Sequence, residues 1–342
     1  MDQQDTLQQV LEAGDKRRAE RREFFRYAGG FGIAAAGAAV LSACGGNDDD
    51  DGGTVSPTAT PTPSPTGSAT STPTPTPTAT EADVLNFALN LEYLEAQFYA
   101  YAANGTGLPA SMLGGAGTAG EATGARQVAF TDPLVARYAR EIAADEQAHV
   151  AFLRRTIGTT AIAQPAIDLS TAATGAFSAA AVAAKLIKQG ETFDPYASDE
   201  NFLLAAFLFE DVGVTAYRGA IGFLSTTAYI DGTAGIQASE AYHAGLIRTV
   251  LYRKGVDAAA LIEATETISD ARDGLDGAGD ADQGVKIQNG ASNIVPSDGT
   301  GLAYGRTPQQ VLNIVYLNRE SKTSGGFFPQ GVNGFLKTSG AN

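Results

Sequence analysis

Several residue types that often stabilise or equip a protein are scarce in this chain. Its 342 residues include no tryptophan, one cysteine, two histidines and two methionines. A single cysteine excludes a disulfide within the chain. Basic residues are also few, because 23 Lys and Arg stand against 38 Asp and Glu and leave a net charge of −15. A surface of this charge without a basic stripe repels phosphate backbones, so we expect no nucleic-acid partner.

The residues that are abundant favour a helical protein. Hydrophobic residues make up 44% of the chain, enough for a core built from Ala, Leu, Ile, Val, Phe and Tyr. The many Ala and Leu residues favour helices over sheets. The length allows one or two domains, but much of the beginning cannot pack a core. We therefore expect one folded domain with a peripheral extension.

The N-terminus has the features of an export signal. Arg21 and Arg22 form a twin-arginine pair, and the apolar run Tyr27–Ala43 follows. This run is shorter than the about 20 residues that span a bilayer, and it ends in a Leu-Ser-Ala-Cys lipobox at Cys44. These features predict a Tat-type lipoprotein signal peptide over residues 1–43, with Cys44 as the lipidated residue. The protein is then exported and lipid-anchored in the cell envelope, on the outer side of a bacterial membrane. An uncleaved N-terminal anchor is the alternative, and it also places the domain outside the cytoplasm.

Residues 44–80 have the composition of a stalk. From Thr54 to Thr80 the chain consists almost entirely of Thr, Pro, Ser and Ala. The segment has no apolar periodicity, and its repeated prolines keep it from packing a core. We predict a disordered Thr/Pro/Ser-rich spacer that carries the folded domain away from the membrane.

Apolar periodicity predicts four long helices after the stalk. Helix starts and stops are marked by capping residues and by Gly or Pro. The first helix has a capping-box-like start at Thr80–Asp83 and apolar periodicity over Val84–Ala103. The other three run from Asp132 to the residue before Gly158, over about Ser198–Leu224 and over about Ala234–Lys254. The long connection between the second and third helices, 158–197, has room for a short helix around Ser178–Lys188. We predict an all-α four-helix bundle over residues 81–256 with this long crossover, and a helical and loop extension over 257–342.

The four helices repeat one polar pattern twice. The first and third helices each carry a glutamate followed seven residues later by a tyrosine, and the second and fourth each carry Glu-x-x-His. The residues are Glu92 and Tyr99, Glu210 and Tyr217, Glu146 and His149, and Glu240 and His243. A single Glu-x-x-His is a weak signal, but here both histidines of the chain satisfy the pattern, which is rare by chance.

This pattern predicts a dinuclear metal site. Helical positions i and i+3 lie about 60° apart around the axis, so each Glu-x-x-His pair projects from one face. Glu92 and Glu210 stand inside apolar helices, where an isolated ionised carboxylate is costly and a cation relieves the cost. Four carboxylates and two imidazoles suit iron or manganese. We therefore predict two Fe or Mn ions per chain, with these ligands: Glu92, Glu146, His149, Glu210, Glu240 and His243.

Other polar residues near these positions have competing interpretations. Tyr99 and Tyr217 can hydrogen-bond the ligating carboxylates or can simply pack in the core. Glu95 competes with Glu92 as the ligand of the first helix, but its counterpart in the third helix is Gly213. Three further acids are interpreted as surface or rim charges: Glu141, Asp145 and Asp211.

At these residues the chain resembles the ferritin-like superfamily, which includes ferritins, rubrerythrins and manganese catalases. The stretch Leu85–Tyr101 is similar to one branch in particular, the desiccation-related proteins of plants and bacteria. Two C-terminal runs, 304–312 and 325–331, are similar to the end of the same branch. The resemblance implies a ferritin-like bundle, and the superfamily's ligands fall on the six residues named above. It does not imply an established reaction.

Two interpretations of the function stay open. In the first, the centre is a di-iron or di-manganese oxidoreductase that oxidises Fe(II) or removes peroxide in stress defence, with O2 or peroxide as its small-molecule substrate. In the second, the protein is a non-catalytic desiccation-related or stress-related protein of the envelope, with its metal structural or absent. Iron storage in a closed cage is less favoured, because a stalked subunit is poorly suited to a shell. The sequence leaves homo-oligomerisation open.

Overall fold

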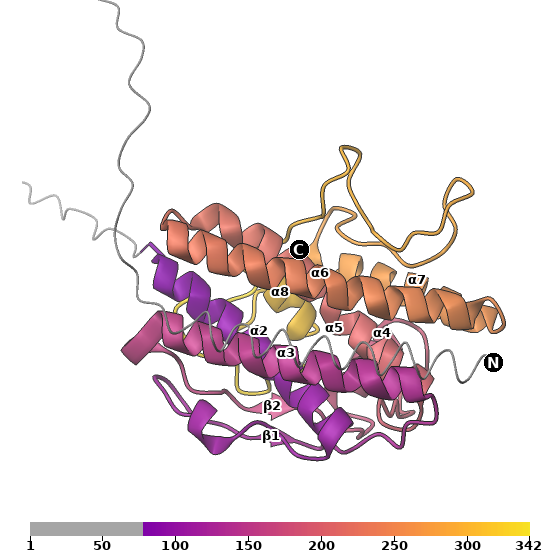
Figure 1. The fold of residues 1–342 in the computed structure, drawn as a ribbon, viewed down its shortest axis with the longest axis horizontal. Coiled ribbons are helices and arrows are strands. Elements are labelled where there is room, and N and C mark those ends of the chain that lie inside the picture. Colours follow the sequence, from indigo (N-terminus) through magenta and orange to yellow (C-terminus); the bar gives the residue numbers. More distant parts are fainter. Residues whose placement is uncertain (1–77) are drawn as a thin grey trace, which may run out of the picture. The chain divides into compact units, whose positions relative to one another are not determined.

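The computed structural model describes residues 78–342 (Figure 1). The predicted signal peptide, Cys44 and nearly all of the predicted stalk lie outside the described residues. The described part is all-α apart from one short pair of strands. Its helices are α2 (Glu81–Asn104), α3 (Pro133–Ile157), α4 (Ala176–Ala183), α5 (Asp199–Ala220), α6 (Thr227–Gly255), α7 (Ala259–Asp276) and α8 (Pro308–Val315). None of the helices in this part is both long enough and apolar enough to cross a membrane.

Capping residues set the starts of three long helices where the sequence predicts them. Thr80 begins α2 through a capping box, in which its hydroxyl accepts from the amide of Asp83 while the carboxylate of Asp83 accepts from the amide of Thr80. The Asp132 side chain caps α3, with proline at the first helical position. Ser198 caps α5. These side chains satisfy amides that have no partner inside the helix.

Two predicted helix ends are wrong. α6 begins at Thr227 and not at Ala234, because packing compensates for the glycines that weaken this stretch. At Gly232 a Cβ atom would lie 2.4 Å from the ring of Phe152 in α3, so only a glycine allows this approach. α5 ends at Ala220, before the predicted Leu224, and a 3-10 turn follows.

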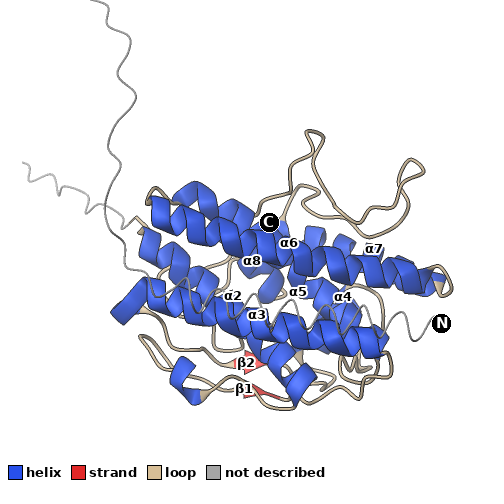
Figure 2. Cartoon of the chain, in the orientation of Figure 1, coloured by secondary structure: helices blue, strands red, loops and turns tan. Residues whose placement is uncertain are grey.

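The four long helices form the bundle in two antiparallel pairs. α2 packs along α3 and α5 packs along α6, and the pairs meet through contacts of α2 with α5 and of α3 with α6 (Figure 1). The crossover between α3 and α5 carries α4. It also carries the strand β2 (Ile167–Asp168), which runs parallel to β1 (Ala122–Thr123) beside the bundle (Figure 2). The connection thus brings the second pair alongside the first.

The C-terminal extension closes one flank of the bundle with aromatic side chains. Phe327 is buried and its ring centroid lies 5.0 Å from that of Phe209 in α5 and 5.1 Å from that of Phe177 in α4. Farther on, the backbone of Asn333 exchanges hydrogen bonds with the side chain of Asn90 in α2. The segment therefore shields the α2 and α5 side of the core, which holds the glutamates of those helices.

Arginines and aspartates buried between the bundle and the extension form an ion network. Arg248 of α6 and Arg272 of α7 both donate to Asp211 of α5, at 2.8 and 3.0 Å. Arg306, just before α8, pairs with Asp276 and with Asp282, which also accepts from Arg272; Arg306 is 1% exposed. Asp211 is thus buried, and its interpretation as a surface or rim charge is wrong. The apolar periodicity of α5 could not show this, because the partners come from distant helices.

Candidate metal centre

The six predicted ligands come together in the middle of the bundle. α2 contributes Glu92, α5 contributes Glu210, and α3 and α6 each contribute a Glu-x-x-His pair. The four glutamates are at most 1% exposed, and the two histidines are 9% and 5% exposed. Each side chain leaves a different turn of a rigid helix, so backbone geometry and not a loop determines its position.

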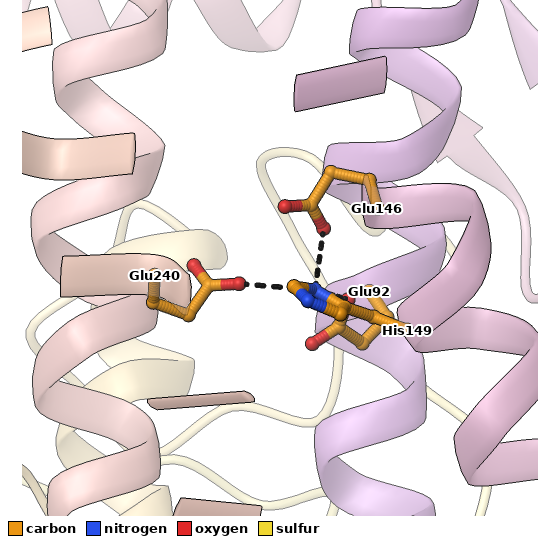
Figure 3. Close-up of side chains that lie close together, drawn as sticks. All are labelled: Glu92, Glu146, His149 and Glu240. Carbon is orange, nitrogen blue, oxygen red and sulfur yellow. Dashed lines mark ion pairs between the residues drawn. The ribbon is translucent and has the colours of Figure 1, made fainter. Parts of the chain in front are cut away.

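The first group of donors surrounds the imidazole of His149. Its Nδ1 atom lies 3.3 Å from Glu92 Oε2, 3.6 Å from Glu146 Oε2 and 3.4 Å from Glu240 Oε1. Figure 3 shows these three carboxylates arranged around the ring, with Glu240 reaching across from the opposite helix. The four ligand atoms all lie within 4.8 Å of one another, which is close enough to hold one ion.

The second group surrounds the other histidine and shares a carboxylate with the first. His243 Nδ1 lies 3.1 Å from Glu146 Oε1 and 3.5 Å from Glu210 Oε2. Glu146 therefore turns one oxygen to each histidine, and the two rings are 6.0 Å apart between centroids. A carboxylate shared in this way can bridge two ions.

The donor atoms fit a metal because they have no other partners. Both Nδ1 atoms, both oxygens of Glu146 and of Glu240, and one oxygen each of Glu92 and Glu210 are buried without a hydrogen bond. The nitrogen–oxygen distances above suit ion pairs, but none of these contacts forms a hydrogen bond. Leaving so many buried polar atoms unsatisfied is costly, and bound cations would satisfy them together. Four carboxylates and two imidazoles are ligands that iron and manganese accept.

Electrostatics in the metal-free centre show how strongly it attracts positive charge. Burial, followed by the charge of Glu146, raises the pKa of Glu92 to about 7. Burial likewise raises the pKa of Glu210 and raises that of Glu240 well above its usual range. Burial alone would lower the pKa of His149, but the charges of Glu92 and Glu146 raise it. The centre therefore retains protons where cations are absent, and metal ions would displace them.

Two tyrosines link the helix pairs through the ligating glutamates. The hydroxyl of Tyr99, on α2, donates to Glu210 of α5, and the hydroxyl of Tyr217, on α5, donates to Glu92 of α2. Each tyrosine thus hydrogen-bonds the glutamate of the other helix. Both bonds use the oxygen that faces away from the histidines, which leaves the second oxygen free to bind a metal. Their role beside a bound metal stays a prediction.

Asp145 lies next to the centre but also reaches solvent. Its side chain is 46% exposed, and its Oδ2 atom lies 3.4 Å from Nε2 of His243, the ring nitrogen that faces away from the ligand group. A carboxylate at this nitrogen orients the imidazole so that Nδ1 is offered to the metal. The interpretation of Asp145 as a rim charge missed this contact, because it joins α3 to α6. Glu141, one turn earlier on α3, is half-buried and is in neither ligand group.

Glu95 is a fifth buried glutamate at the centre, beside the four candidate ligands. It is 4% exposed, and one of its oxygens has no hydrogen-bond partner. It belongs to neither ligand group, so the geometry favours Glu92 as the donor from α2. Burial, then the charge of Glu240, raises the pKa of Glu95 well above its usual range, which favours the neutral form of the carboxyl. The neutral form explains how the bundle tolerates it.

Gly213 provides the space that Glu95 and Glu240 share. A Cβ atom there would lie 2.3 Å from Glu240 Oε2 and 3.3 Å from Glu95 Oε1.

We expect Gly213→Ala to push the Glu240 carboxylate away from His149 and to weaken metal binding by about tenfold or more, because overpacking costs about 1–3 kcal/mol. Competition with a chelator measures the affinity, and Gly235→Ala, where a Cβ meets no atom within 4 Å, is the control. Equal metal affinities in the two variants would show that the position of the Glu240 carboxylate does not depend on the space beside Gly213.

Comparison with known protein families adds to this geometry. The family model described as the ferritin-like domain matches residues 80–253. This range contains α2, α3 and α5, all but the end of α6, and all six candidate ligands. This range is about half of the chain. It ends before α7 and the C-terminal extension. No solved structure matches the chain.

Two curated proteins are similar over a longer range. One is named ferritin-like catalase Nec2, from Nesocodon mauritianus, and is 30% identical over 276 residues, which cover 74% of this chain and 84% of that protein. The other is named desiccation-related protein PCC13-62, from Craterostigma plantagineum, and is 30% identical over 270 residues, which cover 74% and 83%. The similarity therefore reaches beyond the domain match and agrees with the resemblance to desiccation-related proteins.

Proposed function

The chain belongs to the ferritin-like domain family, and we propose that its buried centre holds two iron or manganese ions and removes hydrogen peroxide. The observation that carries the proposal is the position of Glu146, which turns one buried, unpaired oxygen toward each histidine. Two donor groups that share a carboxylate are what a dinuclear site requires. A relative named as a ferritin-like catalase supports peroxide as the substrate.

The proposed reaction needs no partner other than peroxide. Two molecules of hydrogen peroxide give two of water and one of dioxygen. One peroxide takes up two electrons and two protons, and the other releases them. Iron or manganese supplies the two-electron redox couple when bound. The protein residues hold the ligand set: Tyr99 and Tyr217 fix the outer oxygens of Glu210 and Glu92, and the buried surroundings exclude bulk water.

Oxidation of Fe(II) is a second reaction that the same donors support. Ferrous ions are then the substrate, and two of them give two electrons to one peroxide, which takes up two protons and becomes two waters. The oxygen-rich ligand set, with four carboxylates against two imidazoles, favours the ferric product. A non-catalytic role in drying stress is the remaining candidate, and the relative named as a desiccation-related protein favours it.

We also propose where the protein acts. The twin-arginine pair, the apolar run and the lipobox support export and a lipid anchor at Cys44, on the outer side of a bacterial membrane. Residues 44–80 then form a spacer between the membrane and the bundle. Mass spectrometry of the N-terminus from membrane fractions tests this location, because an intact Met1 without lipid on Cys44 contradicts it.

The activity is tested with protein loaded separately with iron and with manganese. We expect about two ions per chain, and oxygen release from hydrogen peroxide in one of the two metal forms, measured with an oxygen electrode. The controls are the protein stripped of metal and the His149→Ala variant. Fe(II) oxidation without oxygen release would instead support the second reaction. Protein that is fully loaded but inactive in both assays would leave the non-catalytic role.

A further inference from the structure

A groove between α3 and α6 leads from solvent to one side of the centre. Its volume is about 1010 Å³, and both helices line it together with Ile294 and Val295 of the loop after α7. His243 is part of the lining, whereas the four ligating glutamates are at most 1% exposed. The centre thus comes nearest to this groove at its second donor group, that of His243.

The groove carries negative charge on the way to His243. Glu141 and Asp145 lie one helical turn apart on α3, and both line it. No Lys or Arg is among the residues that line the groove in the described structure. Asp145 lies between solvent and the metal centre, because its side chain is 46% exposed while its Oδ2 atom lies 3.4 Å from His243 Nε2. Acidic residues in a recess focus the electric field and raise the local concentration of cations.

The matching position on the other helix lacks this charge. Asp145 directly precedes the ligand Glu146, and the residue that directly precedes Glu240 in α6 is Ser239. Ser239 also lines the groove but is uncharged. The two halves of the bundle carry the same ligands, but the residue before each Glu-x-x-His pair differs. The repeated ligand pattern therefore does not explain why an acid, Asp145, lies beside His243.

We propose that the groove between α3 and α6 is the entrance through which divalent cations reach the centre, and that Asp145 transfers them from solvent to the donor group of His243. The inference rests on the proposed dinuclear site and adds its route of loading. Cations attracted by Asp145 then meet His243 and Glu146 first. The ion for the His149 group follows across Glu146, which faces both groups.

The test narrows the groove without touching a ligand. Gly245 lines the groove, and a Cβ added there meets no atom within 4 Å, so Gly245→Leu places a bulky side chain in open space. Leucine also favours a helix more than glycine does, by about 1 kcal/mol, so the fold is retained. Gly274→Leu in α7 is the matched control, because Gly274 has the same open space and does not line the groove. A second variant, Asp145→Asn, removes the charge and keeps the size.

The measurement is the rate at which metal-free protein takes up Mn²⁺, followed by the loss of the electron paramagnetic resonance signal of the free ion. We expect Gly245→Leu and Asp145→Asn to slow uptake by about tenfold, with Gly274→Leu at the wild-type rate. Added salt should slow the wild type and affect Asp145→Asn less. Gly245→Leu should still reach the wild-type content of metal.

Failure of the entrance and failure of the site give different results. Wild-type protein that binds no Mn²⁺ or Fe²⁺ at equilibrium overturns the proposed function, and the entrance with it. Wild-type protein that binds two ions, alongside a Gly245→Leu variant that loads at the same rate, overturns the entrance alone. Equal slowing in Gly274→Leu also counts against it, because the effect would then not come from the groove.

Discussion

Replacing Glu146 with glutamine is expected to remove both metal ions from the protein. Glu146 is the residue shared by the two donor groups, with one oxygen facing each histidine. Glutamine keeps the shape but loses the charge, and it replaces one of the two carboxylate oxygens with an NH2 group, which cannot bind a cation. We expect the metal content to fall from about two ions per chain to nearly none, measured by elemental mass spectrometry after dialysis.

Variants of other glutamates separate this bridging role from a general loss of charge. Glu240 belongs only to the His149 group, so Glu240→Gln is expected to lose one ion and to keep the other. Glu263 is exposed on α7 and pairs with Lys286, so Glu263→Gln should retain both. Circular dichroism confirms the fold of each variant. A Glu146→Gln protein that holds as much metal as Glu240→Gln would contradict the bridging role.

Replacing Arg248 with methionine is expected to destabilise the protein by about 3–5 kcal/mol, because the buried Asp211 loses one of its two arginine partners and four backbone carbonyls lose their donor. Arg248 is fully buried and donates to Asp211 and to four backbone carbonyls of the extension, among them those of Gly284 and Asn293. Methionine fills much of the space but donates no hydrogen bond. Urea unfolding at pH 7 gives the change in the free energy of unfolding.

An exposed ion pair at the C-terminal end of the same helix provides the control. Arg253 pairs with Asp257 four residues later, and their side chains are 74% and 81% exposed. Exposed pairs contribute about 0–1 kcal/mol, so Arg253→Met should change stability little. If Arg248→Met costs no more than Arg253→Met, the buried network does not hold the extension to the bundle. A metal content that falls in Arg248→Met would show further that Asp211, beside Glu210, helps to position that ligand.

The long helices could be predicted from sequence because their signals are local. Apolar periodicity and the caps at Thr80, Asp132 and Ser198 depend on residues within one or two turns. The start of α6 could not be predicted in this way. In the sequence, Gly232 indicates a weak point in a helix. The helix includes it because the ring of Phe152, which is distant in the sequence, packs closely against this position.

The ligand set also follows from short spacings, whereas the contacts around it do not. A Glu-x-x-His pair shares one helix face wherever the helix lies, so the six candidates could be chosen before their helices were placed. The sequence does not show that Tyr99 bonds Glu210 and Tyr217 bonds Glu92, since each bond crosses from one helix pair to the other. The environments of Asp145 and Asp211 were missed for the same reason.

By itself, the sequence determined which residues are offered on which face of each helix, because side-chain direction in a helix follows from spacing alone. The tertiary structure decided which faces meet. It made Glu146 the shared carboxylate, buried Asp211 between two arginines, and gave Glu240 the space above Gly213. These outcomes depend on how four helices and a distant C-terminal segment pack against one another. Local spacing carries no information about that packing.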